Sequence, residues 1–364
     1  MSDRKRIVVA MSGGVDSSVA AALLVNQGYN VTGMMLRLWN DPAAAGSNRC
    51  CSPEAMAMAR SVAARLGILF YAVDAQDIFR RKVVQYLIDG YSQGITPNPC
   101  LACNRYIRWE FLLDHILTSG IELMATGHYA RLRRADNGCI QLLRGSDQSK
   151  DQSYVLSMLS QEKLEHTIFP LGDYTKPEVR QLARDFVLPV AERLESQDLC
   201  FTGDSDYRDF ILRHTTGAVK PGPILNPQGQ LIGQHNGLAL YTIGQRKGIG
   251  IPGPGPLYVL DKDLAQNALI VGNHDGLGKQ SMMVSEVNWV AGKTPQLPFR
   301  SQVKIRYRSR ETWGTVTPQQ DTSAQVQFDE PVLAITPGQI AVFYDSDVCL
   351  GGGIIQQVYP EPIA

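Results

Sequence analysis

The chain has 364 residues, of which 44% are hydrophobic and 19% are charged, and its formal net charge is zero. This composition is that of a soluble globular protein with two or three domains, and it excludes nucleic-acid binding through a strongly basic overall field. Seven cysteines in a chain of this length do not indicate a disulfide scaffold, and their odd number favours reduced thiols. No stretch is long enough to span a bilayer, so we expect a cytoplasmic protein.

The first predicted element is an apolar strand, residues 7–11, which ends in Ser12-Gly13-Gly14 and is followed at once by a helical pattern. A helix N-terminus offers unpaired N–H groups and a positive dipole end, both of which favour an anion. Gly13 and Gly14 let the backbone approach a phosphate closely. Asp16 is a candidate ligand for Mg²⁺ held against that phosphate.

Residues 12–17 read Ser-Gly-Gly-Val-Asp-Ser. No lysine follows the glycines as in a Walker A loop, and the Gly-x-Gly-x-x-Gly pattern of dinucleotide folds is absent. The segment resembles the pyrophosphate-binding loop of ATP pyrophosphatases, enzymes that adenylate an oxygen and release pyrophosphate. An ordinary strand-to-helix turn is the competing interpretation.

Strands and helices alternate along the next part of the chain. We predict strands at 31–36 and 68–74, and helices at 53–66, after the N-cap Ser52, and at 78–91. This alternation predicts an α/β fold with a doubly wound parallel sheet, in which ligands lie beyond the carboxyl ends of the strands.

Two prolines around Asn98 predict a stiff, extended loop that carries Cys100 and Cys103. A helix over 108–119 and a strand ending at Gly127 follow. We interpret Gly127 as a place where the backbone lets a nucleotide approach, and the next residue, His128, as a hydrogen-bonded structural residue.

Later segments predict a hairpin at 131–145, a polar exposed segment at 150–153, and a helix at 177–185. A Gly- and Pro-rich stretch at 244–255 suits either a backbone-dominated binding surface or a loop between short strands. Short strands from Ser281 onward predict an all-β barrel. The chain therefore divides into an α/β domain, a small central domain and a C-terminal β-barrel, with predicted bounds 1–205, 206–279 and 280–364.

Cys100 and Cys103 form a Cys-x-x-Cys pair without the second pair that zinc usually requires. Three interpretations stay open: Cys103 is a catalytic thiol, the two cysteines are redox partners, or both join Cys200 as ligands of an iron–sulfur cluster. Two buried apolar thiols are the structural alternative.

Taken together and in this order, several short motifs resemble those of the tRNA-specific 2-thiouridylase family, which thiolates the wobble uridine of tRNA. The resemblance covers nearly the whole chain. The motifs are Ser12-Gly13-Gly14-Val15-Asp16-Ser17, Thr96-Pro97-Asn98-Pro99, Cys103-Asn104, Thr126-Gly127-His128-Tyr129, Lys150-Asp151-Gln152-Ser153-Tyr154, Cys200-Phe201 and Thr242-Ile243-Gly244-Gln245-Arg246.

The resemblance implies a mechanism and a set of residues. ATP adenylates the 2-oxygen of the uridine, a Cys200 persulfide loaded by an upstream sulfur donor supplies the sulfur, and Cys103 is the partner thiol in a resulting disulfide. The residues implied for ATP are Ala10, Met11, Ser12, Gly13, Gly14, Val15, Asp16, Ser17, Leu36 and Gly127; those implied for tRNA are Asn98, Pro99, Cys100, Lys150, Asp151, Gln152, Arg306 and Tyr307.

This chain departs from the family pattern at two positions. Many members carry Asp where this chain has Cys100, so a role of that Asp does not carry over, and the cluster interpretation gains weight. Leu36 stands where relatives usually have Met, which a backbone contact to adenine would tolerate.

A basic segment gives an independent indication of nucleic-acid binding. Lys304, Arg306, Arg308 and Arg310 alternate along a predicted strand and would share one face, which suits a phosphate backbone. The alternative is a charged, solvated strand edge. The competing functions are an amide-forming synthetase, which would not need paired cysteines, and a cluster- or metal-binding redox protein.

Overall fold

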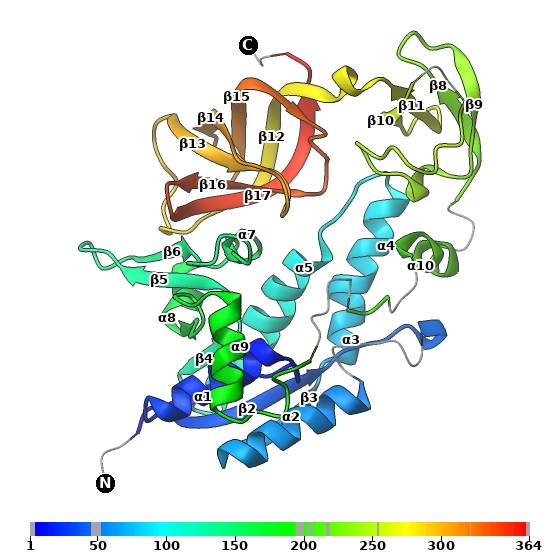
Figure 1. Cartoon of the computed structure of the whole chain (residues 1–364). Coiled ribbons are helices and arrows are strands. Elements are labelled where there is room, and N and C mark those ends of the chain that lie inside the picture. The colour runs from blue at the N-terminus through cyan, green and yellow to red at the C-terminus, as the bar shows by residue number, and fades with distance from the viewer. Residues whose placement is uncertain are drawn as a thin grey trace.

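The computed structural model describes residues 4–44, 52–193, 200–202, 206–215, 219–252, 255–320 and 322–361. Within these ranges the strands form three sheets, and Figure 1 shows a helix-covered sheet at one end of the molecule and a barrel at the other. No helix in the described ranges is long and apolar enough to cross a membrane.

The N-terminal sheet is entirely parallel and has the order β3-β2-β1-β4-β7. The order reverses between β1 and β4, and the crevice at such a reversal is where ligands of doubly wound sheets bind. The predicted fold class is confirmed. The strands are β1 (Arg6–Ala10), β2 (Asn30–Arg37), β3 (Leu69–Asp74), β4 (Leu123–Thr126) and β7 (Thr167–Ile168).

Helices cover both faces of this sheet. On one face α1 (Val15–Asn26), α2 (Pro53–Leu66) and α9 (Lys176–Asp185) share a core with Ile7 and Val9. On the other face a helix over 99–118 packs against the alternate side chains of the same strands. It runs through α5 (Pro99–Ala102), the π-helical η3 (Cys103–Leu112) and α6 (Leu113–Thr118).

Local sequence explains where these helices begin and end. The Ser52 hydroxyl accepts a hydrogen bond from Ala55 N at 3.1 Å, Pro53 opens α2, and Gly67 closes it in the left-handed region. The helix predicted at 78–91 spans residues 76–92, and its middle turn is a π-helix. Its parts are α3 (Gln76–Phe79), η2 (Arg80–Val84) and α4 (Gln85–Ser92).

The predicted hairpin consists of β5 (Ala130–Arg134) and β6 (Ile140–Arg144), and it leaves the N-terminal layer to join the barrel sheet. The shorter helical segments that surround it and the central region are η1 (Pro42–Ala44), α7 (Ser153–Leu156), α8 (Gln161–Glu165), α10 (Tyr207–His214), η4 (Leu238–Leu240) and η5 (His274–Leu277).

The central region has a four-stranded sheet of order β10-β11-β8-β9 around a small core that includes Ile224, Val259 and Leu269. Its strands are β8 (Gly222–Leu225), β9 (Leu231–His235), β10 (Tyr258–Asp263) and β11 (Ala268–Gly272). The Gly- and Pro-rich stretch at 244–255 lies between β9 and β10, and its residues 253 and 254 lie outside the described residues.

The C-terminal strands close into the predicted barrel, because β12 pairs with both β15 and β17. The hairpin extends this sheet through Leu143 and Leu142, which pair with Val348 and Cys349. The domain bounds 1–205, 206–279 and 280–364 stay a prediction. The barrel strands are β12 (Gly278–Trp289), β13 (Phe299–Lys304), β14 (Thr312–Pro318), β15 (Ala324–Leu333), β16 (Ile340–Asp345) and β17 (Val348–Tyr359).

Candidate active site

The loop between β1 and α1 is built to leave backbone N–H groups open to a ligand. Gly14 is the N-cap residue of α1, and it has no side chain to bond the N–H groups of the first turn. Inside the loop, Ser12 N donates to Ser17 Oγ at 3.1 Å, and the two hydroxyl oxygens lie 3.2 Å apart. The loop is therefore rigid, while the helix end stays able to bind an anion.

Two glycines allow close backbone packing around this loop. Gly13 has φ +71°, and a Cβ there would lie 2.3 Å from Ala55 O, the backbone of α2. A Cβ on Gly127, just after β4, would lie 2.7 Å from Ser17 N. The loops that follow β1 and β4 therefore meet at the reversal of strand order, which brings predicted ATP residues from both together.

The remaining residues implied for ATP lie at the same edge. Ala10 ends β1 and pairs with Met34 of β2 and Thr126 of β4. Met11 N donates to Met34 O at 2.7 Å, and Leu36 lies two residues further along β2. Val15 is buried as the first residue of α1. The strand ends thus surround the loop as the sheet topology requires.

Asp16 is held by two residues that the sequence analysis did not assign to the ATP site. Its Oδ1 accepts a hydrogen bond from Lys176 Nζ at 2.6 Å and from the Tyr129 hydroxyl at 2.8 Å. Lys176 is only 7% exposed, and its ammonium lies 5.8 Å from the centre of the Tyr129 ring. Lys176 sits at the start of an amphipathic helix, where sequence does not distinguish it from a surface lysine.

The cysteines of the Cys-x-x-Cys pair lie on a helix, so the predicted cysteine-bearing loop is wrong. Asn98 is the N-cap, whose Oδ1 accepts from Leu101 N at 3.1 Å, and Pro99 is the first helical residue. Proline is well suited to that position because its missing N–H would have no helical partner. Cys100 is exposed in the first turn, and Cys103 is half-buried at the point where the helix changes to π geometry.

Cys103 and Cys200 border the same hydrophobic cluster, although they are far apart in the chain. This cluster contains Phe79, Phe201 and Phe210, and both cysteines pack against it with half-buried side chains. Residues 194–199, just before Cys200, lie outside the described residues. Among the described residues no three His, Cys, Asp or Glu side chains are gathered to hold a metal ion, so the interpretation of Cys100, Cys103 and Cys200 as cluster ligands is not favoured.

His128 is buried and neutral, in agreement with its structural interpretation. Arg108 donates to its Nε2 at 3.4 Å, so Nδ1 carries the proton and donates to Thr126 Oγ1 at 2.7 Å. Burial, with a contribution from the Arg108 charge, holds the pKa of His128 well below 6.5.

This shift predicts a loss of stability in mild acid. Below pH 6.5 the unfolded chain binds a proton at His128 that the folded chain does not, so stability falls with pH by up to about 1.4 kcal/mol per pH unit. Urea unfolding at pH 7 and pH 5 should show a smaller pH effect in His128→Asn than in the wild type. Equal pH effects in the two proteins would contradict this role.

The segment 150–153 is not the exposed polar segment that we predicted. Asp151 is buried and accepts hydrogen bonds from Gly145 N and Ser153 N, each at 3.0 Å, while Lys150 and Gln152 are half-buried. Gln152 N donates to Tyr129 O at 2.9 Å, and Gln152 Oε1 accepts from Tyr129 N at 3.0 Å. Asp151 therefore shapes this segment from inside the fold.

The predicted row of four cations on one strand face is also wrong. Strand β13 ends at Lys304, and residues 306–309 form a turn in which Ser309 N donates to Arg306 O at 3.1 Å. The Arg306 side chain points into the protein and donates to Ile243 O and Ala334 O, each at 2.9 Å, and to the Thr336 hydroxyl. Tyr307 remains 41% exposed at the turn.

Arg306 thus links the central region to the barrel, and its removal should destabilise the protein. Arg306→Met removes the guanidinium donor of the half-buried Ile243 carbonyl and one of the two donors of Ala334 O, at a total cost of about 1–3 kcal/mol. Thermal unfolding should show a clearly lower Tm than for Arg308→Met, a change at a more exposed residue of the same turn. A Tm equal to that of Arg308→Met would show that Arg306 does not tie these elements together.

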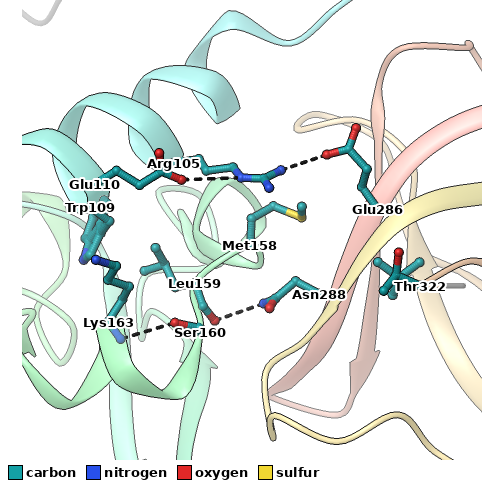
Figure 2. Close-up of a pocket in the computed structure, with 11 residues that line it drawn as sticks. Arg105, Trp109, Glu110, Met158, Leu159, Ser160, Lys163, Glu286, Asn288 and Thr322 are labelled. Atoms are coloured by element: carbon teal, nitrogen blue, oxygen red, sulfur yellow. Dashed lines mark hydrogen bonds and ion pairs between the residues drawn. The ribbon is translucent and has the colours of Figure 1, made fainter. Parts of the chain in front are cut away.

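A cavity of about 370 Å³ lies between the helix over 99–118 and the barrel, and its lining contains none of the residues predicted for ATP, sulfur transfer or tRNA. Figure 2 shows Arg105 reaching across it to Glu286, at 3.0 Å. Asn288 Nδ2 donates to Leu159 O at 3.0 Å from the barrel side. These contacts dock the barrel against the helix that carries Cys103 and against the segment around Leu159, and we assign the cavity to that interface.

Comparisons with known proteins cover almost the whole chain. The family model described as tRNA methyl transferase HUP domain matches residues 5–204, the tRNA methyl transferase PRC-barrel domain matches 208–273, and the Aminomethyltransferase beta-barrel domain matches 279–355.

Three curated relatives of this chain have the same name. The tRNA-specific 2-thiouridylase MnmA of Symbiobacterium thermophilum is 46% identical over 360 residues, which cover 97% of this chain and 92% of that protein. The proteins of the same name from Magnetococcus marinus and Chloroflexus aggregans are also 46% identical, and they cover 98% and 96% of this chain and 100% and 98% of their own lengths. These matches show that the chain belongs to the tRNA-specific 2-thiouridylase family, and the glycine loop at the sheet reversal and the two cysteines on one core agree with them.

Proposed function

We propose that this protein uses ATP to replace the 2-oxygen of the wobble uridine in tRNA by sulfur. The observation that carries the proposal is the packing of Cys103 and Cys200 on one hydrophobic cluster, in a domain whose sheet reversal carries the loop 11–17. The names of the domain models refer to methyl transfer and those of the relatives to thiolation. Two thiols on one core cluster, in the same domain as an anion-binding loop, fit the second chemistry.

The first step is activation of the uridine. The open N–H groups at the start of α1 bind phosphate oxygens of ATP, while Gly13 and Gly127 keep the surrounding backbone close. The 2-oxygen of the uridine attacks the α-phosphate, pyrophosphate leaves, and the oxygen becomes part of an AMP leaving group. The site thereby converts a poor leaving group into a good one.

The second step moves sulfur. The terminal sulfur of a Cys200 persulfide attacks C2, and AMP leaves with the original oxygen. The Cys103 thiolate then attacks Cys200 Sγ, the S–S bond breaks, and the outer sulfur remains on C2 as the thiocarbonyl. A Cys103–Cys200 disulfide is left, and a thiol reductant must supply two electrons before the next turnover.

Mg²⁺ fits the site through Asp16. Among the described residues, both partners of its carboxylate bind Oδ1, so Oδ2 can serve as a ligand beside the phosphates. When bound, the ion would neutralise charge on the triphosphate. An iron–sulfur cluster does not fit, because Cys100, Cys103 and Cys200 are not gathered in a ligand set, and we derive no step through one.

The tRNA contacts fall into two groups. Cys100, Lys150, Gln152 and Tyr307 have side chains that are exposed or half-buried, and we propose that they contact tRNA directly. Asn98, Pro99, Asp151 and Arg306 make internal contacts, and we propose that they shape the surface that tRNA meets. The sulfur donor is a protein that carries a persulfide.

The test is a thiolation assay with anaerobically purified protein, an unmodified tRNA transcript, ATP and a persulfide donor. We expect 2-thiouridine and AMP in equal amounts from protein that contains no iron or sulfide. Thiolation that depends on a stoichiometric cluster would replace the persulfide route. The absence of thiouridine with and without iron would remove the assigned substrate.

A further inference from the structure

Two residues connect the ATP loop to the segment 145–152, which includes residues implied for tRNA. Asp16 lies at the start of α1, and its Oδ1 accepts from both the Lys176 ammonium and the Tyr129 hydroxyl. Both donors are buried, with Tyr129 at 3% and Lys176 at 7% exposure. The Asp16 side chain itself is half-buried, so breaking the pair would leave the buried Lys176 ammonium without this carboxylate partner.

The same two residues are bonded to the segment 145–152 through their backbones. Tyr129 exchanges two hydrogen bonds with Gln152, at 2.9 and 3.0 Å. Lys176 N donates to Asp147 Oδ2 at 2.9 Å, and four residues before it Gly172 O accepts from Ser146 N at 2.8 Å. Tyr129 and Lys176 therefore each bind Asp16 with the side chain and the segment 145–152 with the backbone.

We propose that Tyr129 and Lys176 are positioning residues that couple ATP binding to tRNA binding. This inference rests on the proposed function. The negative triphosphate attracts the Lys176 ammonium and competes with Asp16 for it, so ATP binding changes the contacts that Lys176 and Tyr129 make with Asp16. The change reaches residues 145–152 through Asp147 and Gln152, so that the state which binds ATP also presents this segment to tRNA.

The test measures tRNA affinity with and without α,β-methylene-ATP, an analogue that cannot be cleaved between the α- and β-phosphates. In the wild type we expect the analogue to lower the Kd of a tRNA transcript by about fivefold or more. In Tyr129→Phe and Lys176→Met this ratio should approach one. Arg184 lies on the same helix as Lys176, and Arg184→Met, which removes its exposed ion pair with Glu192, should keep the wild-type ratio.

The ratio separates coupling from a purely structural role. A structural role would lower Tm or weaken both affinities without changing the ratio, and that result overturns the inference. A wild-type ratio of one also overturns it. If Lys176→Met does not fold, Tyr129→Phe, which keeps the ring, decides alone. Thiolation by the wild-type enzyme is measured separately, so a failed proposed function is recognised by its own result.

Discussion

Replacing Cys200 by serine is expected to abolish tRNA thiolation, with a fall in rate of about 10³-fold or more. A serine hydroxyl cannot carry a transferable persulfide sulfur, and no alternative route in the mechanism reaches C2. The change exchanges one sulfur atom for a smaller oxygen in a half-buried side chain at the edge of the cluster around Phe201, so the fold should survive. ATP binding should be unchanged, because the loop 11–17 is built from other elements.

Cys139→Ser is the matched control, since Cys139 is also half-buried but lies in the hairpin turn. Thiouridine formation should be measured by mass spectrometry of digested tRNA, with ATP binding measured on the same preparations. Thiouridine formed by Cys200→Ser at a rate near that of the control would rule out the persulfide on Cys200. Cys103→Ser should also stop turnover.

Gly13→Ala is expected to cost about 2–5 kcal/mol of folding free energy and to weaken ATP binding. About 1–2 kcal/mol comes from forcing a Cβ into the left-handed region, and about 1–3 kcal/mol comes from overpacking. The overlap is with backbone, because the new Cβ would lie 2.3 Å from Ala55 O, so no side-chain rotation can relieve it. Relief of the clash must move the loop that is proposed to bind phosphate.

Gly138→Ala isolates the contribution of this contact. Gly138 has φ +84° in the hairpin turn, and a Cβ there meets no atom within 4 Å. The loss of folding free energy in Gly138→Ala should therefore be limited to the cost of the left-handed backbone conformation. Urea unfolding gives the free-energy change for each variant, and equal losses at the two positions would show that the approach of Gly13 to α2 is not a constraint.

Much of the fold could be predicted because local signals agreed with one another. The alternation of apolar runs and helical patterns was enough for the parallel sheet, and Ser52 and Gly67 marked both ends of α2 where the structure has them. The loop 11–17 was recognisable because its chemistry depends on backbone N–H groups and glycines that are contiguous in sequence.

The wrong predictions concern residues whose conformation or partners are determined by tertiary packing. Pro99 was interpreted as a loop residue, but a proline also suits the first helical position, and only packing of the helix over 99–118 on the sheet selects between them. Arg306 was interpreted as a surface cation because its carbonyl acceptors, Ile243 and Ala334, lie far away in sequence. The contact of Lys176 was missed for a similar reason, because its carboxylate partner, Asp16, lies 160 residues earlier in the chain.

The pairing of β6 with β17 means that β6 is synthesised long before its partner strand. Leu142 and Cys349 are register partners and are almost fully buried, yet they are separated by about 200 residues of chain. At roughly 5–20 residues per second, the hairpin leaves the ribosome roughly 10–40 s before its partner strand exists. During that interval β6 presents an unpaired edge with apolar side chains, and such an edge can pair with a strand of another chain and cause aggregation. Until β17 is made, this edge of β6 therefore lacks the strand that covers it in the folded protein.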